Sequence, residues 1–182
     1  MRKLIVTENL TLDGVMAATE QWSDPYENDE MVERNKAGMS ASDALLLGRV
    51  TYEIFAAYWP HQTNDKTGIA DYLNKTPKFV VSSSLKKADW VNTTILGGDA
   101  VEQITKLKQQ PGKNITVNGS ATLVQTLMKA DLIDEYSLLV FPIILGKGKR
   151  LFPDGMDSSL KLIESNAFSS GVVALTYQPV KK

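Results

Sequence analysis

The segment Ala44-Leu45-Leu46-Leu47-Gly48-Arg49-Val50-Thr51 joins four consecutive apolar residues to a glycine, an arginine and a threonine. A short run that is apolar throughout, without alternation, is typical of a parallel strand buried on both of its faces. We therefore predict a central strand over 44–47, a tight turn, and a helix over 51–58.

Short β-rich runs alternate with helical stretches on both sides of this segment. This alternation indicates an α/β sheet of mostly parallel strands, in which helices form the crossover connections. The polar stretch 59–76 is predicted to be a mobile surface connection. The other predicted strands are 3–7, 78–81, 93–96 and 114–117, and the other predicted helices are 29–39, 101–109 and 121–129.

Beyond Asp131 the pattern changes to strand-like runs without intervening helices, at 135–142, 159–166 and 172–178. The simplest interpretation is an antiparallel edge to the sheet, and no domain boundary interrupts the 182 residues, which predicts a single domain over 1–182. The run 137–145 is apolar without strict alternation. As an edge strand it would have to be covered by the chain's own helices or by a second subunit.

Composition excludes several classes of function. Twenty Lys and Arg residues against 21 Asp and Glu give a net charge of -1, so no global field attracts nucleic acid or anionic membrane, and any anion site is local. The absence of cysteine excludes disulfides, thiolate metal sites and a cysteine nucleophile, and favours the cytoplasm. His61 is the only histidine and is expected on the surface, so we predict no metal site. No apolar run approaches the ~18 residues of a membrane span.

Three places combine a strand end, glycine or hydroxyl residues, and a helix start: 47–51, 81–85 and 117–121. Helix N-termini present unpaired N–H groups, and glycine lets a phosphate approach the backbone. Each place alone is better explained as an ordinary capped turn. Together with the guanidinium of Arg49 and the three serines at 82–84, they suit the ribose 2'-phosphate of NADPH. The basic stretch 145–152 is either a phosphate site for the substrate or a solvated bulged turn.

These segments, in this order and spacing, resemble the dihydrofolate reductase superfamily. Within it they are most similar to the family named after the C-terminal reductase domain of bifunctional riboflavin-biosynthesis deaminase-reductases. The resemblance rests on Thr11-Leu12-Asp13-Gly14, 46–53, 78–85, 117–123 and 132–148, and so spans nearly the whole chain. It implies a dihydrofolate reductase-like α/β fold, with a central, mostly parallel sheet flanked by helices and an antiparallel C-terminal hairpin. It also implies NADPH lying across the strand ends, and a homodimer.

The resemblance assigns cofactor contacts motif by motif. It implies that the pyrophosphate and the 2'-phosphate are held by the turn after the central strand and by the turn before the helix at 121–129. The serine run is implied to contact the 2'-phosphate and adenine, and the loop after the first strand to close beside the nicotinamide. The implied contacts are Leu12, Gly14, Val15, Gly48, Arg49, Thr51, Ser82, Ser83, Ser84, Leu85, Asn118, Gly119, Ser120 and Ala121.

The expected activity is transfer of hydride from NADPH to a small polar C=O or C=N substrate. Asp13 is the candidate proton donor because it lies in the loop beside the nicotinamide, although Asp-Gly is also a common turn pair. Folate enzymes bind the pterin with an acid on their first helix, and Asp29, Glu30 and Glu33 lie in the corresponding region without one being assigned. The zinc deaminase activity of the bifunctional enzymes is excluded, since its cysteines are absent.

Three functions stay open at the level of sequence. The first is a stand-alone NADPH-dependent reductase. The second is the 5-amino-6-(5-phosphoribosylamino)uracil reductase of riboflavin biosynthesis, for whose substrate phosphate Lys147, Lys149 and Arg150 are the available cations. The third is a non-catalytic protein that retains the NADPH pocket.

Overall fold

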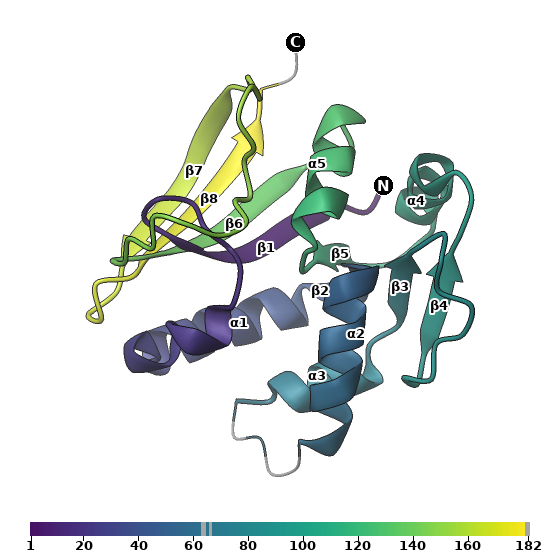
Figure 1. Cartoon of the computed structure of the whole chain (residues 1–182), viewed down its shortest axis with the longest axis horizontal. Helices are drawn as coiled ribbons and strands as arrows, with labels where there is room; N and C mark the ends of the chain where they lie inside the picture. The colour runs from purple at the N-terminus through teal and green to yellow at the C-terminus, as the bar shows by residue number, and fades with distance from the viewer. Residues whose placement is uncertain (63–64, 66, 181–182) are drawn as a thin grey trace.

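The computed structural model describes residues 1–62, 65 and 67–180. One eight-stranded sheet in the order β4-β3-β2-β5-β1-β6-β8-β7 runs through the protein (Figure 1). β1 to β6 pair in parallel, and β8 is antiparallel to both β6 and β7, as the sequence predicted. The strands are β1 (Leu4–Thr11), β2 (Ser42–Gly48), β3 (Lys78–Val81), β4 (Thr93–Leu96), β5 (Asn114–Val117), β6 (Glu135–Phe141), β7 (Leu160–Ala167) and β8 (Val173–Pro179).

Helices cover both faces of the sheet. β2 shows this directly, because Ala44 and Leu46 pack against α4 and α5 while Leu45 and Leu47 pack against α2 and α3. The prediction that this strand is central and buried on both faces is therefore confirmed. The helices are α1 (Asp29–Ser40), α2 (Arg49–Tyr58), α3 (Ile69–Lys75), α4 (Ala100–Gln109) and α5 (Ala121–Lys129), with short 3-10 turns at Thr19–Gln21, Asp24–Tyr26 and Trp59–His61. None of the described helices is long and apolar enough to cross a membrane.

The stretch 59–76 was predicted to be a loop on the surface, and this was wrong for most of its described part. A 3-10 turn and α3 occupy much of it, while residues 63, 64 and 66 lie outside the described residues. α3 docks through Ala70 and Leu73, both of which are buried. Ile69 and Tyr72 are partly buried against the same core. A helix of seven residues makes only about two turns, which is too short to show a helical period in the sequence.

The apolar run 137–145 was predicted to form an edge strand, and this is also wrong. β6 lies inside the sheet, between β1 and β8. Leu138 packs into the core on one face, and on the other Phe141 packs edge-to-face against Trp22, with 5.1 Å between ring centroids. The chain therefore covers both faces of β6 itself.

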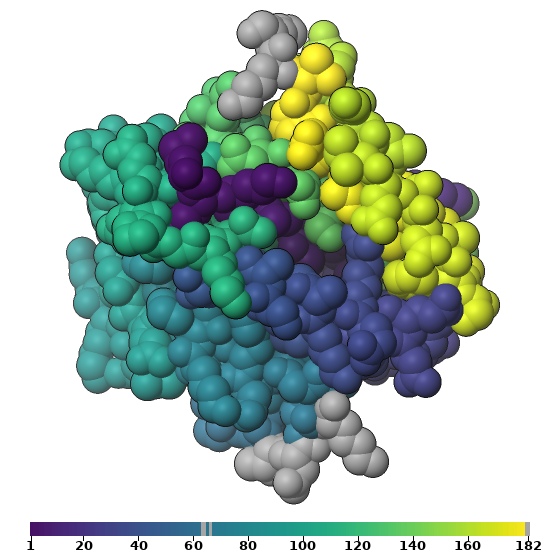
Figure 2. Space-filling model, turned by 180° about the vertical axis from the view of Figure 1, so that it is seen from behind, coloured from purple at the N-terminus to yellow at the C-terminus, as the bar shows by residue number. Residues whose placement is uncertain are grey.

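The true edge on this side of the sheet is β7. Figure 2 shows the C-terminal strands forming one flank of the surface. All residues of β7 after Leu160 are exposed, including Leu162 at 48% and Ile163 at 46%. The exposed edge of the sheet is thus β7, which carries both apolar and charged side chains.

Candidate functional site

The turns after β2 and β5 are in direct contact. The Gly48 N–H donates to the Gly119 carbonyl at 3.0 Å. A Cβ added to Gly48 would lie 2.4 Å from Ser120 Oγ and 2.9 Å from the Ser120 backbone N. Since β2 and β5 are parallel neighbours, their carboxyl ends bring these two turns to the same edge of the sheet. Gly48 is glycine because the Ser120 turn occupies the space of a side chain.

Gly119 lies where three elements converge. Its φ of +64° is in the left-handed region that favours glycine, and its peptide bond to Ser120 is cis. A Cβ here would be 2.9 Å from Thr51 Oγ1, 3.6 Å from Glu8 Oε1 and 3.7 Å from Met16 Cε. Helix α2, strand β1 and the loop after β1 therefore all reach this turn.

The N-terminus of α5 completes the turn. Ser120 is the N-cap, and its Oγ accepts from the Leu123 N–H at 3.4 Å. The Asn118 side-chain amide donates to the Thr7 carbonyl at 3.3 Å and so ties the turn to β1. Lys149 Nζ donates to Thr122 Oγ1 at 3.2 Å, which adds a cation to the positive end of the helix. Ala121 is buried beneath it.

A surface pocket of about 360 Å³ lies beside these turns, at the ends of β3 and β4. It brings Arg49 together with the serines at 82–84, as the resemblance implies. Leu96 and Gly98 also line it and were missed, although Gly97-Gly98-Asp99 before α4 repeats the glycine and cap pattern of the other turns. Leu85 is not part of the lining, since it packs against the core formed with α2 and α3.

Arg49 is paired within its own helix. Its Nη1 donates to both carboxylate oxygens of Glu53 at 2.8 Å. Both side chains are more than 40% exposed, so this i,i+4 pair contributes little to stability. An anionic phosphate can therefore replace Glu53 as the partner of Arg49 at small cost.

The loop after β1 is held by the segment that follows β6. The Leu12 N–H donates to the Ile143 carbonyl at 2.8 Å, and the Leu151 N–H donates to the Gly14 carbonyl at 3.2 Å. Gly14 has a φ of +81°, Val15 is buried, and Leu12 is 65% exposed. The basic stretch predicted at 145–152 thus braces this loop.

Asp13 has the contacts of an anchoring residue. Its carboxylate accepts from Thr11 Oγ1 at 2.7 Å, from the Gly146 N–H at 2.9 Å and from the Leu145 N–H at 3.2 Å. The hydrogen bond from Thr11 is the largest cause that lowers the pKa of Asp13 to about 2. A carboxylate that is ionised at neutral pH has no proton to give, so the geometry favours the turn role of Asp13 over proton donation.

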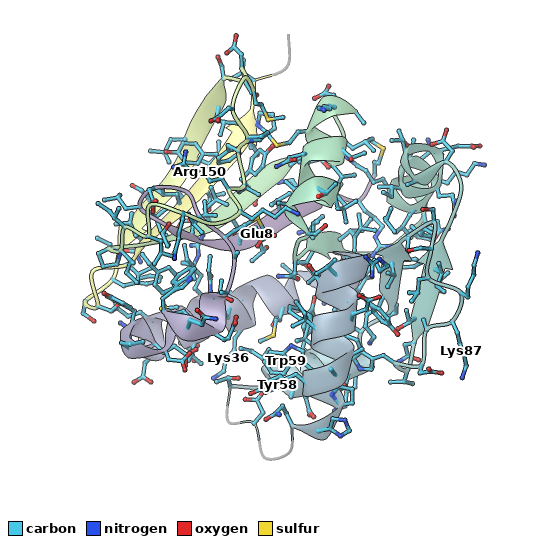
Figure 3. The ribbon with its side chains drawn as sticks, viewed as in Figure 1. Glu8, Lys36, Tyr58, Trp59, Lys87 and Arg150 are labelled. Carbon is cyan, nitrogen blue, oxygen red and sulfur yellow. The ribbon has the colours of Figure 1, made fainter. Side chains whose placement is uncertain are left out.

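Glu8 was not predicted from the sequence. Its Oε1 is inaccessible to solvent and has no hydrogen-bond partner among the described residues. Burial raises the pKa of Glu8 to about 8, while the Gly119 backbone amide lowers it to a smaller extent. In Figure 3, Glu8 lies near the centre of the protein, beside β1 and the start of α5. The predicted first strand ended at Thr7, whereas β1 extends to Thr11, so the sequence did not indicate a charged residue inside this strand.

Asp29, Glu30 and Glu33 of α1 make no hydrogen bond or ion pair with the turns described above. Asp29 is exposed, and Glu30 accepts from Ser169 N at 2.8 Å and from Ser169 Oγ at 2.6 Å, which lowers its pKa. Glu33 pairs with Lys36 at 3.1 Å on the exposed surface. Two of the three candidate acids for pterin binding, Glu30 and Glu33, are therefore engaged by other side chains or backbone groups in this structure.

His61 lies on the exposed 3-10 turn after α2. Across the described part of the chain, no three His, Cys, Asp or Glu side chains gather in a group suited to a metal ion.

Comparison with known proteins identifies the family. The model of the RibD C-terminal domain matches residues 2–174. The chain is 34% identical over 139 residues to the YyaP protein of Bacillus subtilis (strain 168), covering 74% of this chain and 73% of that protein. A putative riboflavin biosynthesis protein from Shewanella sp. PV-4 superimposes with a TM-score of 0.80 at 24% identity, covering 98% of this chain and 99% of that one.

The fold extends to a more distant enzyme. Dihydrofolate reductase from Enterococcus faecalis, in complex with NADP(H), superimposes with a TM-score of 0.61 at 14% identity, covering 98% of this chain and 97% of that chain. The two proteins therefore share the same overall fold. With a family match over nearly all of its residues, the chain belongs to the RibD C-terminal domain family.

Proposed function

We propose that this protein is an NADPH-dependent reductase that transfers hydride to a small polar C=O or C=N substrate. The observation that carries the proposal is the contact between Gly48 and Ser120, beside the pocket of Arg49 and the serine run. These turns follow β3, β2 and β5, which are neighbours in the sheet. A dinucleotide laid across them would run from the serine pocket, over the α5 turn, to the loop after β1.

The residues present fit this cofactor. Arg49 and the serines at 82–84 supply donors for a 2'-phosphate, and Gly48 and Gly119 present backbone without side chains at the pyrophosphate position. The likeness in fold to a dihydrofolate reductase that binds NADP(H) supports the same assignment. NADPH would supply the hydride. The protein would bind and orient it, and the braced loop at 12–15 would exclude water from the nicotinamide.

A second candidate is reduction of 5-amino-6-(5-phosphoribosylamino)uracil. The observation in its favour is that Lys147, Lys149 and Arg150 are exposed on the segment that braces the loop after β1. This segment would place cations within reach of a phosphate on the substrate. The family membership also supports a substrate of the riboflavin pathway.

The test has two stages. Quenching of tryptophan fluorescence would measure the affinity of the protein for NADPH and NADH. Loss of reduced-nicotinamide absorbance would then be followed with pterins, ribosylaminopyrimidine phosphates and small carbonyl compounds. Equal affinity for the two cofactors would contradict the 2'-phosphate site, and tight NADPH binding without turnover of any compound would favour a non-catalytic binding protein.

We also infer a homodimer, formed through β7. No strand among the described residues pairs with the outer edge of β7, and Leu162 and Ile163 are about half exposed. A second copy of the strand would satisfy the backbone groups at this edge and cover both side chains.

A further inference from the structure

The Glu8 side chain is half-buried, and its Oε1 is a solvent-inaccessible oxygen to which the proposed function assigns no role. In β1, Leu4 and Val6 alternate onto one face of the sheet, and both are fully buried. Val6 is paired with Val117 of β5, so Glu8, two residues further on, lies level with Gly119. Glu8 therefore places a carboxyl group where the alternation of the strand calls for an apolar side chain.

The surroundings of Glu8 compensate a negative charge only in part, through the Gly119 backbone amide, whose effect on the pKa is smaller than that of burial. Thr51 Oγ1 and Met16 Cε converge with Glu8 Oε1 on Gly119, and neither group is charged. Oε1 has no hydrogen-bond partner among the described residues. An isolated carboxylate in such a place is very costly, and the usual outcome is that it keeps its proton. The raised pKa, about 8, agrees with this, so the group is mostly neutral at physiological pH.

Glu8 also occupies a defined place along the path of the cofactor. The sheet order β3-β2-β5-β1 puts the serine pocket first, the touching glycine turns second, and β1 with its loop third. Glu8 lies between the touching glycine turns and the loop after β1, where the proposed pyrophosphate turn meets that loop. This is where the nicotinamide ribose would follow the diphosphate.

We propose that Glu8 is a cofactor-binding residue that, as a neutral carboxylic acid, donates a hydrogen bond to the nicotinamide-ribose half of NADPH; this rests on the proposed function. A carboxylic acid offers one donor and one acceptor, which match a ribose hydroxyl or a carboxamide. A carboxylate would offer only acceptors and would repel the adjacent diphosphate. A hydrogen bond to the cofactor would thus satisfy Glu8 Oε1, which has no partner among the described residues.

The experiment measures NADPH affinity between about pH 7 and about pH 9.5, a range in which the cofactor's 2'-phosphate, with a second pKa of ~6, is already fully ionised. We expect the affinity of the wild type to fall by about tenfold or more as Glu8 ionises. Glu8→Gln keeps a donor and an acceptor without the charge. It should bind NADPH equally across the range, with the affinity of the wild type near pH 7. Glu27→Gln, at an exposed position after the 3-10 turn Asp24–Tyr26, is the matched control and should follow the wild type.

Lys78 is another described group that titrates in this range, because burial lowers its pKa to about 8. Its ammonium donates to the carbonyls of Leu73 and Thr76, and Lys78 begins β3 at the opposite end from the site. A pH dependence caused by Lys78 would survive in Glu8→Gln and would overturn the proposal. A pH-independent affinity in the wild type would overturn it as well.

The failure of this proposal can be distinguished from failure of the proposed function. If the wild type does not bind NADPH at any pH, both fail. An NMR titration of the side-chain carboxyl carbons in the cofactor-free protein tests Glu8 directly. We expect one glutamate with a midpoint near 8 that is missing in Glu8→Gln, whereas a midpoint near the ordinary 4.5 contradicts the role of Glu8 even if NADPH binds.

Discussion

Gly48 and Ser120 are far apart in the sequence, yet a single methyl group on Gly48 would lie 2.4 Å from Ser120 Oγ. The contact arises because β2 and β5 pair in parallel, with Leu46 opposite Val117, so that the two turns leave the sheet side by side. Two backbone segments suited to a phosphate are thereby joined into one rigid surface before any ligand binds. Preorganisation of this kind reduces the ordering cost of binding.

Gly48→Ala should force these turns apart. We expect a loss of stability of about 1–3 kcal/mol, as for other overpacked sites, together with weaker NADPH binding. Urea unfolding and cofactor titration measure the two effects. Gly38→Ala is the control, because Gly38 lies within α1 with no atom near its Cβ position, and alanine there should stabilise by roughly 0.5–1 kcal/mol. A Gly48→Ala protein that unfolds and binds like the wild type would disprove the tight contact.

Arg49→Ala should reduce affinity for NADPH and leave NADH unaffected. A charge-assisted contact with phosphate contributes ~1.5–3 kcal/mol, or roughly tenfold or more in affinity. Glu53→Gln is the companion variant, since it releases Arg49 from its i,i+4 partner and should raise NADPH affinity slightly. Calorimetric titration measures the affinities of both variants for NADPH and NADH. If Arg49→Ala lowers the affinities for NADH and NADPH equally, Arg49 does not recognise the 2'-phosphate.

Asp13→Ala tests anchoring against proton donation. Removal of the carboxylate leaves the Leu145 and Gly146 amides without their acceptor, so their hydrogen exchange should become faster. Since the pKa of Asp13 is about 2, the pH profile of turnover near neutrality should keep its shape in the variant. Disappearance of one limb of that profile in Asp13→Ala would instead identify Asp13 as the proton donor.

Glu8 should make stability depend on pH in the cofactor-free protein. Its pKa rises from 4.5 to about 8 on folding, so between these values the folded state binds more protons than the unfolded state. Stability must therefore fall as pH rises through this window, by up to ~1.4 kcal/mol per pH unit. Glu8→Gln should lack this slope and be more stable than the wild type at pH 9. Parallel slopes in urea unfolding of the two proteins would show that Glu8 titrates normally.

The dimer prediction concerns β7. Light scattering coupled to size exclusion should give a mass near twice 20.0 kDa for the wild type. Leu162→Lys and Ile163→Lys should give folded monomers, since both side chains are about half exposed in one chain. Leu139→Glu is the contrasting variant, because Leu139 is buried and the change should unfold the protein. A wild-type mass near 20.0 kDa would reject the dimer.

Much of the fold could be predicted from local patterns. β3, β4, β5 and α5 begin and end where the sequence indicated, because short apolar runs and helical periods are properties of neighbouring residues. The fully apolar run 44–47 likewise indicated a strand buried on both faces. The position of β6 inside the sheet was missed, since strand order depends on pairing between distant segments.

In the candidate site, too, some features could be predicted from local sequence and others depended on tertiary structure. Glycine and hydroxyl residues at strand-to-helix turns are local features, so Gly48, Arg49 and the serine run could be named as candidates from the sequence alone. Tertiary structure decided what those features do together. It placed Gly48 against Ser120, bound Asp13 to the Gly146 amide so that it stays ionised, and enclosed Glu8 among uncharged neighbours so that it keeps its proton. Charge state depends on burial and on hydrogen-bond partners, and these are supplied by segments that the sequence does not place side by side.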